Sequence, residues 1–235
     1  MTPKVLIVLT SHGKIDATGN PTGWFLPEFA HPHEVLKNKV SLTIASPKGG
    51  EAPLDPASVK MFESDELSQK FLKEQKSLWE NTHKLEDMIP RVGEFDAIFY
   101  VGGHGPMFDL TTSKTSLSLI QAFAAANKPV AAVCHAPCVL LNATAPSGER
   151  LISGVTVTGF SNDEEDAVAL SSVMPFMLET ELEKISGGKY VKAAEPWGEK
   201  VVVGKAAGTG SVLITGQNPA SAGKVGEEIL RALGL

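Results

Sequence analysis

The sequence contains few of the residues that mark several classes of protein. It has only two cysteines, Cys134 and Cys138, in 235 residues. Two cysteines could form one disulfide, but these lie four positions apart at the start of an expected helix. Since there is also no export signal, we expect reduced thiols and a cytoplasmic location. Lys and Arg total 21 against 27 Asp and Glu, and they form no cluster. Because phosphate binding needs clustered positive charge, a nucleic-acid partner is not expected.

Long hydrophobic runs are also missing from the amino-terminal region. The run Val5–Leu9 ends at the polar residues Thr10, Ser11 and His12, so it is too short for a signal peptide or a membrane span. Hydrophobic residues make up 43% and charged residues 20% of the chain, as in ordinary globular proteins. We therefore expect a folded protein that has no membrane partner.

Short apolar runs alternate with stretches of helical spacing along the chain. The runs are rich in β-branched residues and predict buried strands at Val5–Leu9, Val40–Ala45, Ala97–Val101, Val130–Val133, Val155–Thr158 and Val212–Thr215. The helical stretches are Leu117–Ala126, Asp166–Ile185 and Ala220–Leu233. This alternation predicts an α/β three-layer sandwich, with a mostly parallel central sheet covered on both faces.

Two segments do not fit the alternation. They are a Gly/Pro-rich stretch at about 11–32 and a polar stretch at about 49–91, which contains apolar residues at helical spacing. We interpret both as insertions near the active site, and the second as one or two surface helices. No linker divides the chain, so residues 1–235 are predicted to form a single domain.

The segment Val130–Leu141 carries the clearest chemical signal. A predicted strand passes directly into an apolar helix, and Cys134 lies at the junction with Ala132 and Ala136 two positions to either side. These are the mechanics of a nucleophile elbow, and a helix amino terminus would favour the thiolate of Cys134. The alternative is that Cys134 is a small buried apolar residue, which is the interpretation that we prefer for Cys138.

Two neighbouring motifs can complete a cysteine-based site. The glycines of Gly102–Pro106 follow a predicted strand, so the Gly103 amide and the amide after Cys134 are candidates for an oxyanion hole, although a plain βα turn has the same sequence. His135 is the candidate general base. One carboxylate of the acidic run 163–166 can orient it, although most of these acids suit a helix amino terminus.

These motifs together resemble the ThiJ/PfpI superfamily, which has the class I glutamine-amidotransferase-like, flavodoxin-like fold. The resemblance is to the branch of heat-shock chaperones and glutathione-independent glyoxalases. It covers nearly the whole chain and rests on Lys4–Ser11, Thr22–Glu28, His31–Pro32, Gly102–Asp109, Ala131–Pro137, Thr158–Glu165 and Thr215–Ser221.

The resemblance implies a role for individual positions. It makes Cys134 the nucleophile, His135 its partner and Glu165 the carboxylate that orients the histidine, with Glu164 as the alternative. Glu28 would hydrogen-bond the cysteine, and either Glu28 or His135 would carry a proton between substrate carbons. His104 either contacts substrate oxygens or makes a structural hydrogen bond.

The implied activity is that of a glyoxalase III, or D-lactate dehydratase, a lyase that needs neither metal nor glutathione nor another cofactor. It would convert methylglyoxal and other small 2-oxoaldehydes to 2-hydroxy acids through a Cys134 hemithioacetal. The alternatives are a stress-induced holding chaperone or protein deglycase, and a cysteine peptidase or amidase that uses the same residues. The resemblance also implies a homodimer.

Overall fold

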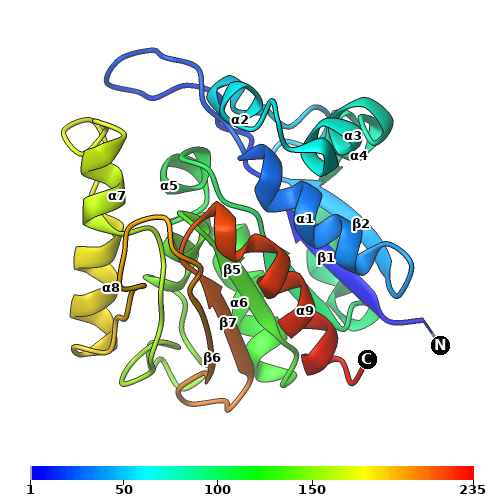
Figure 1. The fold of residues 1–235 in the computed structure, drawn as a ribbon. Coiled ribbons are helices and arrows are strands. Elements are labelled where there is room, and N and C mark those ends of the chain that lie inside the picture. Colours follow the sequence, from blue (N-terminus) through cyan, green and yellow to red (C-terminus); the bar gives the residue numbers. More distant parts are fainter. Residues whose placement is uncertain (1) are drawn as a thin grey trace.

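The computed structural model describes residues 2–235, which form a seven-stranded sheet with helices on both faces (Figure 1). The strand order is β3-β2-β1-β4-β5-β7-β6, and every pairing is parallel except that of β6 with β7. The strands are β1 (Lys4–Val8), β2 (Ser41–Ser46), β3 (His83–Lys84), β4 (Ala97–Tyr100), β5 (Val130–Val133), β6 (Val201–Lys205) and β7 (Val212–Gly216). The predicted α/β sandwich with a mostly parallel sheet is confirmed.

Helices cover the sheet on both sides. On one face α1 (Leu26–Leu36) packs along α9 (Ala222–Ala232), and on the other α6 (Lys114–Ala125) packs on β4 and β5 (Figure 1). The shorter α-helices are α2 (Pro56–Met61), α3 (Glu66–Glu74), α4 (Ser77–Glu80), α5 (Gly105–Asp109), α7 (Asn162–Ala167) and α8 (Leu178–Ser186). The 3-10 helices are η1 (Leu85–Glu94), η2 (Ala136–Leu140) and η3 (Pro219–Ser221). Within residues 2–235, no helix is long and apolar enough to cross a membrane.

The centre of the sheet fixes where a ligand can bind. β1 is buried beyond Lys4 and pairs with β2 on one side and β4 on the other, so the chain order reverses between β1 and β4. In open α/β sheets, ligands bind outside the carboxyl ends of the strands at such a reversal. Gly102 follows β4 and Cys134 follows β5, which places both of them at that end of the sheet.

The predicted strand at Val155–Thr158 is wrong. Val157 makes only an isolated bridge to Tyr190, although the segment is apolar and partly buried. The edge of β7 is occupied instead by β6, an antiparallel strand that the sequence analysis did not predict. The backbone amide of Thr158 donates to the side chain of Thr215 at 3.0 Å, so this segment packs beside the sheet without joining its ladder.

The predicted helix at Asp166–Ile185 is two helices. α7 ends at Ala167, Ala169 adopts a left-handed conformation with φ of 59°, and α8 begins only at Leu178. Pro175 lies in the connection, where it lacks the amide hydrogen that a continuous helix would need. A gap in helical backbone therefore separates two segments whose apolar spacing looked continuous.

The two predicted insertions contribute differently to the structure. The stretch 11–32 is irregular as far as Phe25 and then enters α1, a helix that the sequence analysis did not predict. The stretch 49–91 contains three short helices, α2, α3 and α4, where one or two surface helices were predicted, and then β3 and most of η1. In Figure 1 these helices lie beyond α1, towards the carboxyl ends of the strands.

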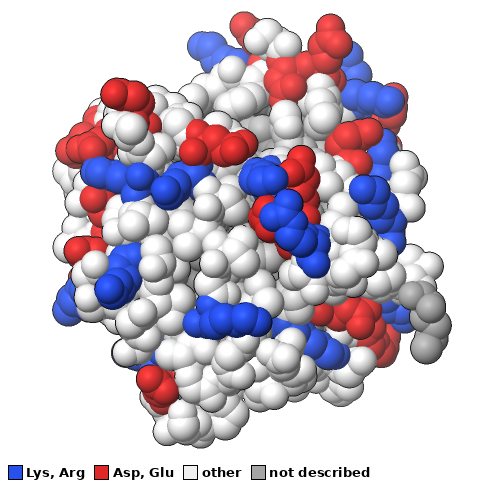
Figure 2. All heavy atoms as spheres, turned by 60° about the horizontal axis from the view of Figure 1, so that its bottom comes forward, with Lys and Arg blue, Asp and Glu red and all other residues white. Residues whose placement is uncertain are grey.

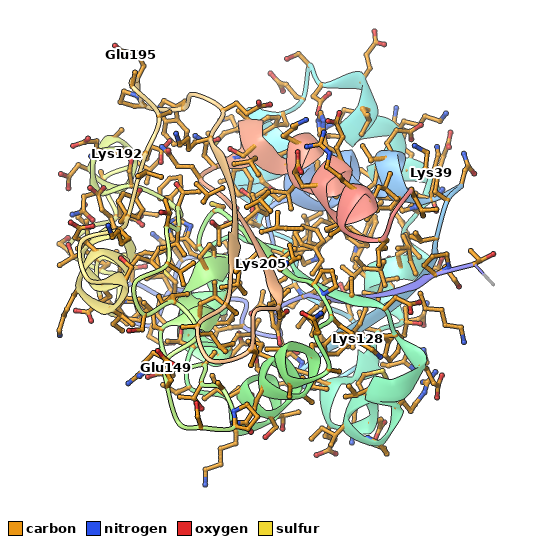
Figure 3. The ribbon with its side chains drawn as sticks, turned by 90° about the horizontal axis from the view of Figure 1, so that it is seen from below. Lys39, Lys128, Glu149, Lys192, Glu195 and Lys205 are labelled. Carbon is orange, nitrogen blue, oxygen red and sulfur yellow. The ribbon has the colours of Figure 1, made fainter. Side chains whose placement is uncertain are left out.

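At the opposite end of the sheet, where the parallel strands begin, the polar contacts hold the fold together. Figure 3 views the molecule from this end, where Lys128 lies before β5 and donates to the carbonyl of Val92 at 3.1 Å and to that of Phe95. Figure 2 shows basic and acidic side chains interspersed over the face that it draws. That face therefore carries no basic patch of the kind that binds nucleic acid.

Candidate active site

Cys134 occupies a sharp turn between β5 and η2. Its φ is 60°, a left-handed conformation that side chains other than glycine rarely adopt. The strained turn is anchored on both sides, because the Cys134 amide donates to the Gly216 carbonyl at 2.9 Å and the Cys134 carbonyl accepts from the Phe160 amide at 2.8 Å. Backbone strain that is held in this way is common at functional sites. The elbow predicted at Cys134 is present.

Three side chains form a chain of contacts that starts at this turn. The sulfur of Cys134 lies 3.2 Å from Nδ1 of His135, and Nε2 of His135 lies 2.6 Å from Oε2 of Glu165. The other carboxylate oxygen, Oε1, lies 2.8 Å from Nε2 of His104. All four residues are buried, although Cys134, His135 and His104 also line a cavity.

The charge on Glu165 determines the tautomer of His135. The two neighbouring histidines hold the pKa of Glu165 well below its ordinary value despite the opposing effect of burial, so the carboxylate is ionised. It therefore accepts hydrogen from Nε2 of His135, which leaves Nδ1 free to accept a proton from the thiol. Burial and the neighbouring His104 lower the pKa of His135, so at neutral pH the imidazole is uncharged.

The expected thiolate at a helix start is not what this environment favours. η2 is a five-residue 3-10 helix rather than an α-helix, so its dipole is small. Burial and the adjacent charge of Glu28 raise the pKa of Cys134 well above its ordinary value, and these effects outweigh the opposing effect of the Gly103 amide. The resting sulfur is therefore a thiol, and it needs a base such as His135 to ionise it.

Glu28 comes from α1 and lies against the same sulfur. It is fully buried, and neither carboxyl oxygen has a hydrogen-bond partner of ordinary geometry among the described residues. Burial raises its pKa well above the ordinary value, and the charge of Asp55 adds to the effect. The carboxyl lies so close to Gly102 that a Cβ there would stand 2.4 Å from Oε2, which makes glycine necessary at this position.

Gly103 is placed beside the cysteine as predicted. Its amide faces the sulfur of Cys134 and lowers the thiol pKa. Its φ is 100°, and a Cβ would lie 2.3 Å from the carbonyl oxygen of Gly23, so a side chain is excluded both by conformation and by space. The amide of Cys134 itself is bonded to Gly216, whereas the amide after Cys134, that of His135, stays a predicted second donor.

The structure separates the two neighbouring glutamates of α7. Glu165 contacts His135, whereas Glu164 forms a capping box with Ser161 and turns away from the histidine. Oε1 of Glu164 accepts from the side chains of Gln217 at 3.0 Å and Asn218 at 2.8 Å. The same oxygen accepts from the backbone amide of Trp197 at 2.9 Å. Glu164 therefore organises the wall of the site rather than the histidine.

A cavity of about 460 Å³ opens above Cys134 and His135. Most of its wall is apolar and includes the side chains of Ile15, Phe25, Met61, Phe160, Leu170 and Trp197. Thr22 and Asp55 add a polar pair, with 3.0 Å between the Thr22 hydroxyl oxygen and Asp55 Oδ2. Among residues 2–235, no lysine or arginine lines the cavity. This environment suits an uncharged, largely apolar molecule.

The sequence analysis missed most of this wall. It assigned no role to Phe160, yet the centroid of this ring lies 4.3 Å from that of His135 and 5.6 Å from that of Trp197, against which it packs edge-on. Trp197 carried no motif at all. Its one local signal is its place after Pro196 in a Gly/Pro-containing loop, and such loops are common.

His104, His135 and Glu165 are also a group that can hold a metal ion. Their donor atoms all lie within 4.8 Å of one another, and all three residues are buried. Both Nε2 atoms point at Glu165 and are bonded to it. An ion there would have to replace these two hydrogen bonds.

The sequence and the fold match known proteins over nearly their whole length. A model of the DJ-1/PfpI family matches residues 27–169. The chain belongs to the DJ-1/PfpI family. It is 30% identical to Glyoxalase 3 of Candida albicans, over 97% of this chain and 98% of that protein.

Two crystal structures extend this family likeness. Glyoxalase III from Candida albicans superimposes with a TM-score of 0.84 at 29% identity, covering 98% of this chain and 97% of that one. The Rapid Encystment Protein 24 KDa of Francisella tularensis superimposes with a TM-score of 0.87 at 35% identity, covering 98% of this chain and 99% of that one. The resemblance to the ThiJ/PfpI superfamily and to its glutathione-independent glyoxalase branch is thus confirmed.

Proposed function

We propose that this protein is a glutathione-independent glyoxalase that converts methylglyoxal and related 2-oxoaldehydes to 2-hydroxy acids. The observation that carries the proposal is the ordered contact chain Cys134–His135–Glu165 at the floor of an apolar cavity. Similar proteins named as glyoxalases support it. The reaction class is that of a lyase.

In the first step the sulfur of Cys134 adds to the aldehyde carbon. Nδ1 of His135, 3.2 Å from the sulfur, takes the thiol proton, and the ionised Glu165 stabilises the imidazolium that results. The aldehyde oxygen becomes an alkoxide, which accepts this proton to give a neutral hemithioacetal. The Gly103 amide, which faces the sulfur, is the donor placed to stabilise the oxyanion.

In the second step a proton moves between the two oxygenated carbons. A base removes the hydrogen of the former aldehyde carbon to give an enediol, and return of the proton to the neighbouring carbon gives a thioester. We assign this base to Glu28, because its buried carboxyl contacts the sulfur of Cys134 and burial raises its pKa. Water then cleaves the thioester, releasing the 2-hydroxy acid and the free thiol, and methylglyoxal yields D-lactate.

The protein supplies its own thiol, and this is why we propose independence from glutathione and other cofactors. Glutathione carries two carboxylates, and the cavity offers no lysine or arginine to bind them. We further propose that residues 1–235 act as a single domain, in the cytoplasm and as a homodimer. Both cysteines are unpaired, which suits a reducing compartment.

The direct test is to incubate the purified protein with methylglyoxal without glutathione and to measure D-lactate. We expect Cys134→Ala to abolish lactate formation, because the hemithioacetal cannot form. Cys138→Ala is the matched control, since Cys138 is buried nearby, does not line the cavity, and should leave activity largely intact. Absence of lactate from the unaltered protein, or equal lactate from Cys134→Ala, contradicts the proposal.

The same preparations test the other activities. The chain is 26% identical, over 71% of its length, to a protein/nucleic acid deglycase of Escherichia coli. Removal of methylglyoxal adducts from a protein after all free methylglyoxal has been dialysed away would establish deglycation. Suppression of client aggregation that survives Cys134→Ala would establish a thiol-independent chaperone, and cleavage of peptide or amide substrates would establish a hydrolase.

A further inference from the structure

The cavity is much larger than methylglyoxal requires. That substrate has three carbons, whereas cavities of about 300–1,000 Å³ bury ligands of drug size. The volume here is about 460 Å³, and Cys134 and His135 form only part of its lining. The reactive end of a 2-oxoaldehyde bound to Cys134 would therefore leave most of the apolar wall without a partner.

We propose that the enzyme selects 2-oxoaldehydes with a bulky, uncharged apolar substituent on the ketone carbon, and that Trp197 is a specificity-determining residue for this substituent. The inference rests on the proposed glyoxalase function and deepens it. The chemistry at Cys134 is unchanged, since the substituent replaces the methyl group of methylglyoxal and takes no part in the bonds that form or break.

The composition of the wall determines the kind of substituent. Phe25, Met61 and Leu170 present apolar side chains, and no lysine or arginine lines the cavity. Asp55, the one carboxylate in the lining, is engaged by Thr22 and by the amides of α2. A phosphate or carboxylate on the substrate would find no cationic partner here, whereas an alkyl chain or an aryl ring would be removed from water.

Trp197 is held over this cavity by an unusual backbone conformation. Its φ is 64°, and it is anchored by the hydrogen bond from its amide to Glu164. The side chain lines the cavity, packs edge-on against Phe160 and is 40% exposed. A large aromatic side chain that is 40% exposed, strained in its backbone and fixed at the wall of the cavity contributes little to a core, so a bound substituent is the partner that it fits.

A second cavity supports the same assignment. It has a volume of about 490 Å³ and shares Met61, Trp197 and Pro219 with the first. Met61 is 57% exposed, so Met61 and Trp197 together stand at the boundary between the two spaces. A substituent that outgrows the first cavity therefore has an open direction past Trp197.

The test is the steady-state kinetics of straight-chain 2-oxoaldehydes, from methyl- through propyl- to pentylglyoxal, with phenylglyoxal alongside. The aldehyde reactivity of the alkyl series is nearly constant, so burial dominates the differences. We expect kcat/KM to rise about threefold for each added methylene, mainly through KM, as apolar transfer predicts. Phenylglyoxal should be accepted as well as the longer alkyl substrates.

Variants identify the residue responsible. In Trp197→Ala we expect the ratio of kcat/KM for pentylglyoxal over methylglyoxal to fall by about threefold or more, and Trp197→Phe should restore most of it. Ile89→Ala is the matched control, because Ile89 is 45% exposed and lies outside the cavity, and it should leave the ratio unchanged.

Three failures are distinguishable. If methylglyoxal is converted but kcat/KM stays flat or falls along the series, the substituent inference is wrong and the proposed function stands. An unchanged ratio in Trp197→Ala removes Trp197 as the specificity residue. If no member of the series is converted, the glyoxalase function itself is wrong and the inference falls with it.

Discussion

At the scale of single residues, the environments of the site determine which of its groups carry charge before substrate binds. Burial keeps Cys134 a thiol and His135 uncharged, while two histidines keep Glu165 ionised. Only Glu165 carries a settled charge, and it acts on the sulfur through His135. The histidine can therefore accept a proton only with its Nε2 hydrogen directed at Glu165.

This dependence predicts a large effect of Glu165→Gln. The amide cannot stabilise the imidazolium and no longer requires the productive tautomer, so we expect kcat on methylglyoxal to fall by about 10²–10⁴-fold. Asp166→Asn is the control, since Asp166 is the next residue of α7, is exposed, and bonds to Ser171 rather than to the site. A Glu165→Gln enzyme that keeps half its activity would show that His135 needs no orienting carboxylate.

At the scale of elements, α7 links the catalytic contacts to the cavity wall. Its capping box at Ser161 and Glu164 fixes where the helix begins, and Glu165 then faces His135. Just beyond the helix, the left-handed Ala169 turns the chain so that Val168 and Leu170 both line the cavity. One short helix thus positions both the orienting carboxylate and part of the substrate wall.

The left-handed residue after α7 gives a test of this arrangement. Glycine adopts such a conformation without strain, so Ala169→Gly should stabilise the protein by about 0.5–1 kcal/mol. This corresponds to a rise in Tm of roughly 1–4 °C for a chain of this size. Ala167→Gly, within α7, should lower Tm by a similar amount. Calorimetry that finds Ala169→Gly destabilising would contradict the assigned backbone conformation.

At the scale of the whole molecule, the sheet assembles the site from distant parts of the chain. Glu28 comes from α1, Gly103 follows β4, Cys134 follows β5 and Glu165 lies on α7. Burying the Glu28 carboxyl costs folding free energy, because burial disfavours its charged form. The function that we propose therefore lowers the stability of the fold that supports it.

That cost predicts a pH dependence. Because burial raises the folded pKa of Glu28 above its ordinary value of 4.5, its contribution to stability is intact below about pH 4.5 and is lost as pH rises through the folded pKa. Glu28→Gln should therefore be more stable than the unaltered protein at pH 7.5. We expect a gain on the order of 1 kcal/mol in the free energy of unfolding, which corresponds to a Tm about 2–4 °C higher. The gain should shrink towards pH 4.5.

An exposed glutamate provides the control for this prediction. Glu94 pairs with Arg91 and has a lowered pKa, so Glu94→Gln should bring no gain in Tm at pH 7.5. A Glu28→Gln variant that is less stable than the unaltered protein at both pH values would show that the carboxylate is stabilised in the fold.

The sequence by itself determined the parts that depend on local pattern. Buried strands of a parallel sheet are continuous apolar runs, so five of them were found, and the strained turn at Cys134 was visible in its small neighbours Ala132 and Ala136. The resemblance added Glu28 and Glu165, which no local pattern singles out. The helix break at Ala169 was missed because apolar spacing continues through it. The edge strand β6 was missed because only its pairing with β7 in the folded protein makes it a strand.

Tertiary structure alone decided the charge states and the cavity. The pKa of Cys134 follows from burial beside Glu28, 106 positions earlier in the chain, and this reversed the expected thiolate. Glu164 and Glu165 are adjacent and chemically identical. Only the direction of each side chain on α7 decides that Glu164 bonds to the cavity wall at Trp197 and Glu165 bonds to His135. Trp197 reaches the cavity because of one backbone angle and one long-range hydrogen bond. Such interactions act between residues that are neighbours only after folding, so no reading of sequence order could supply them.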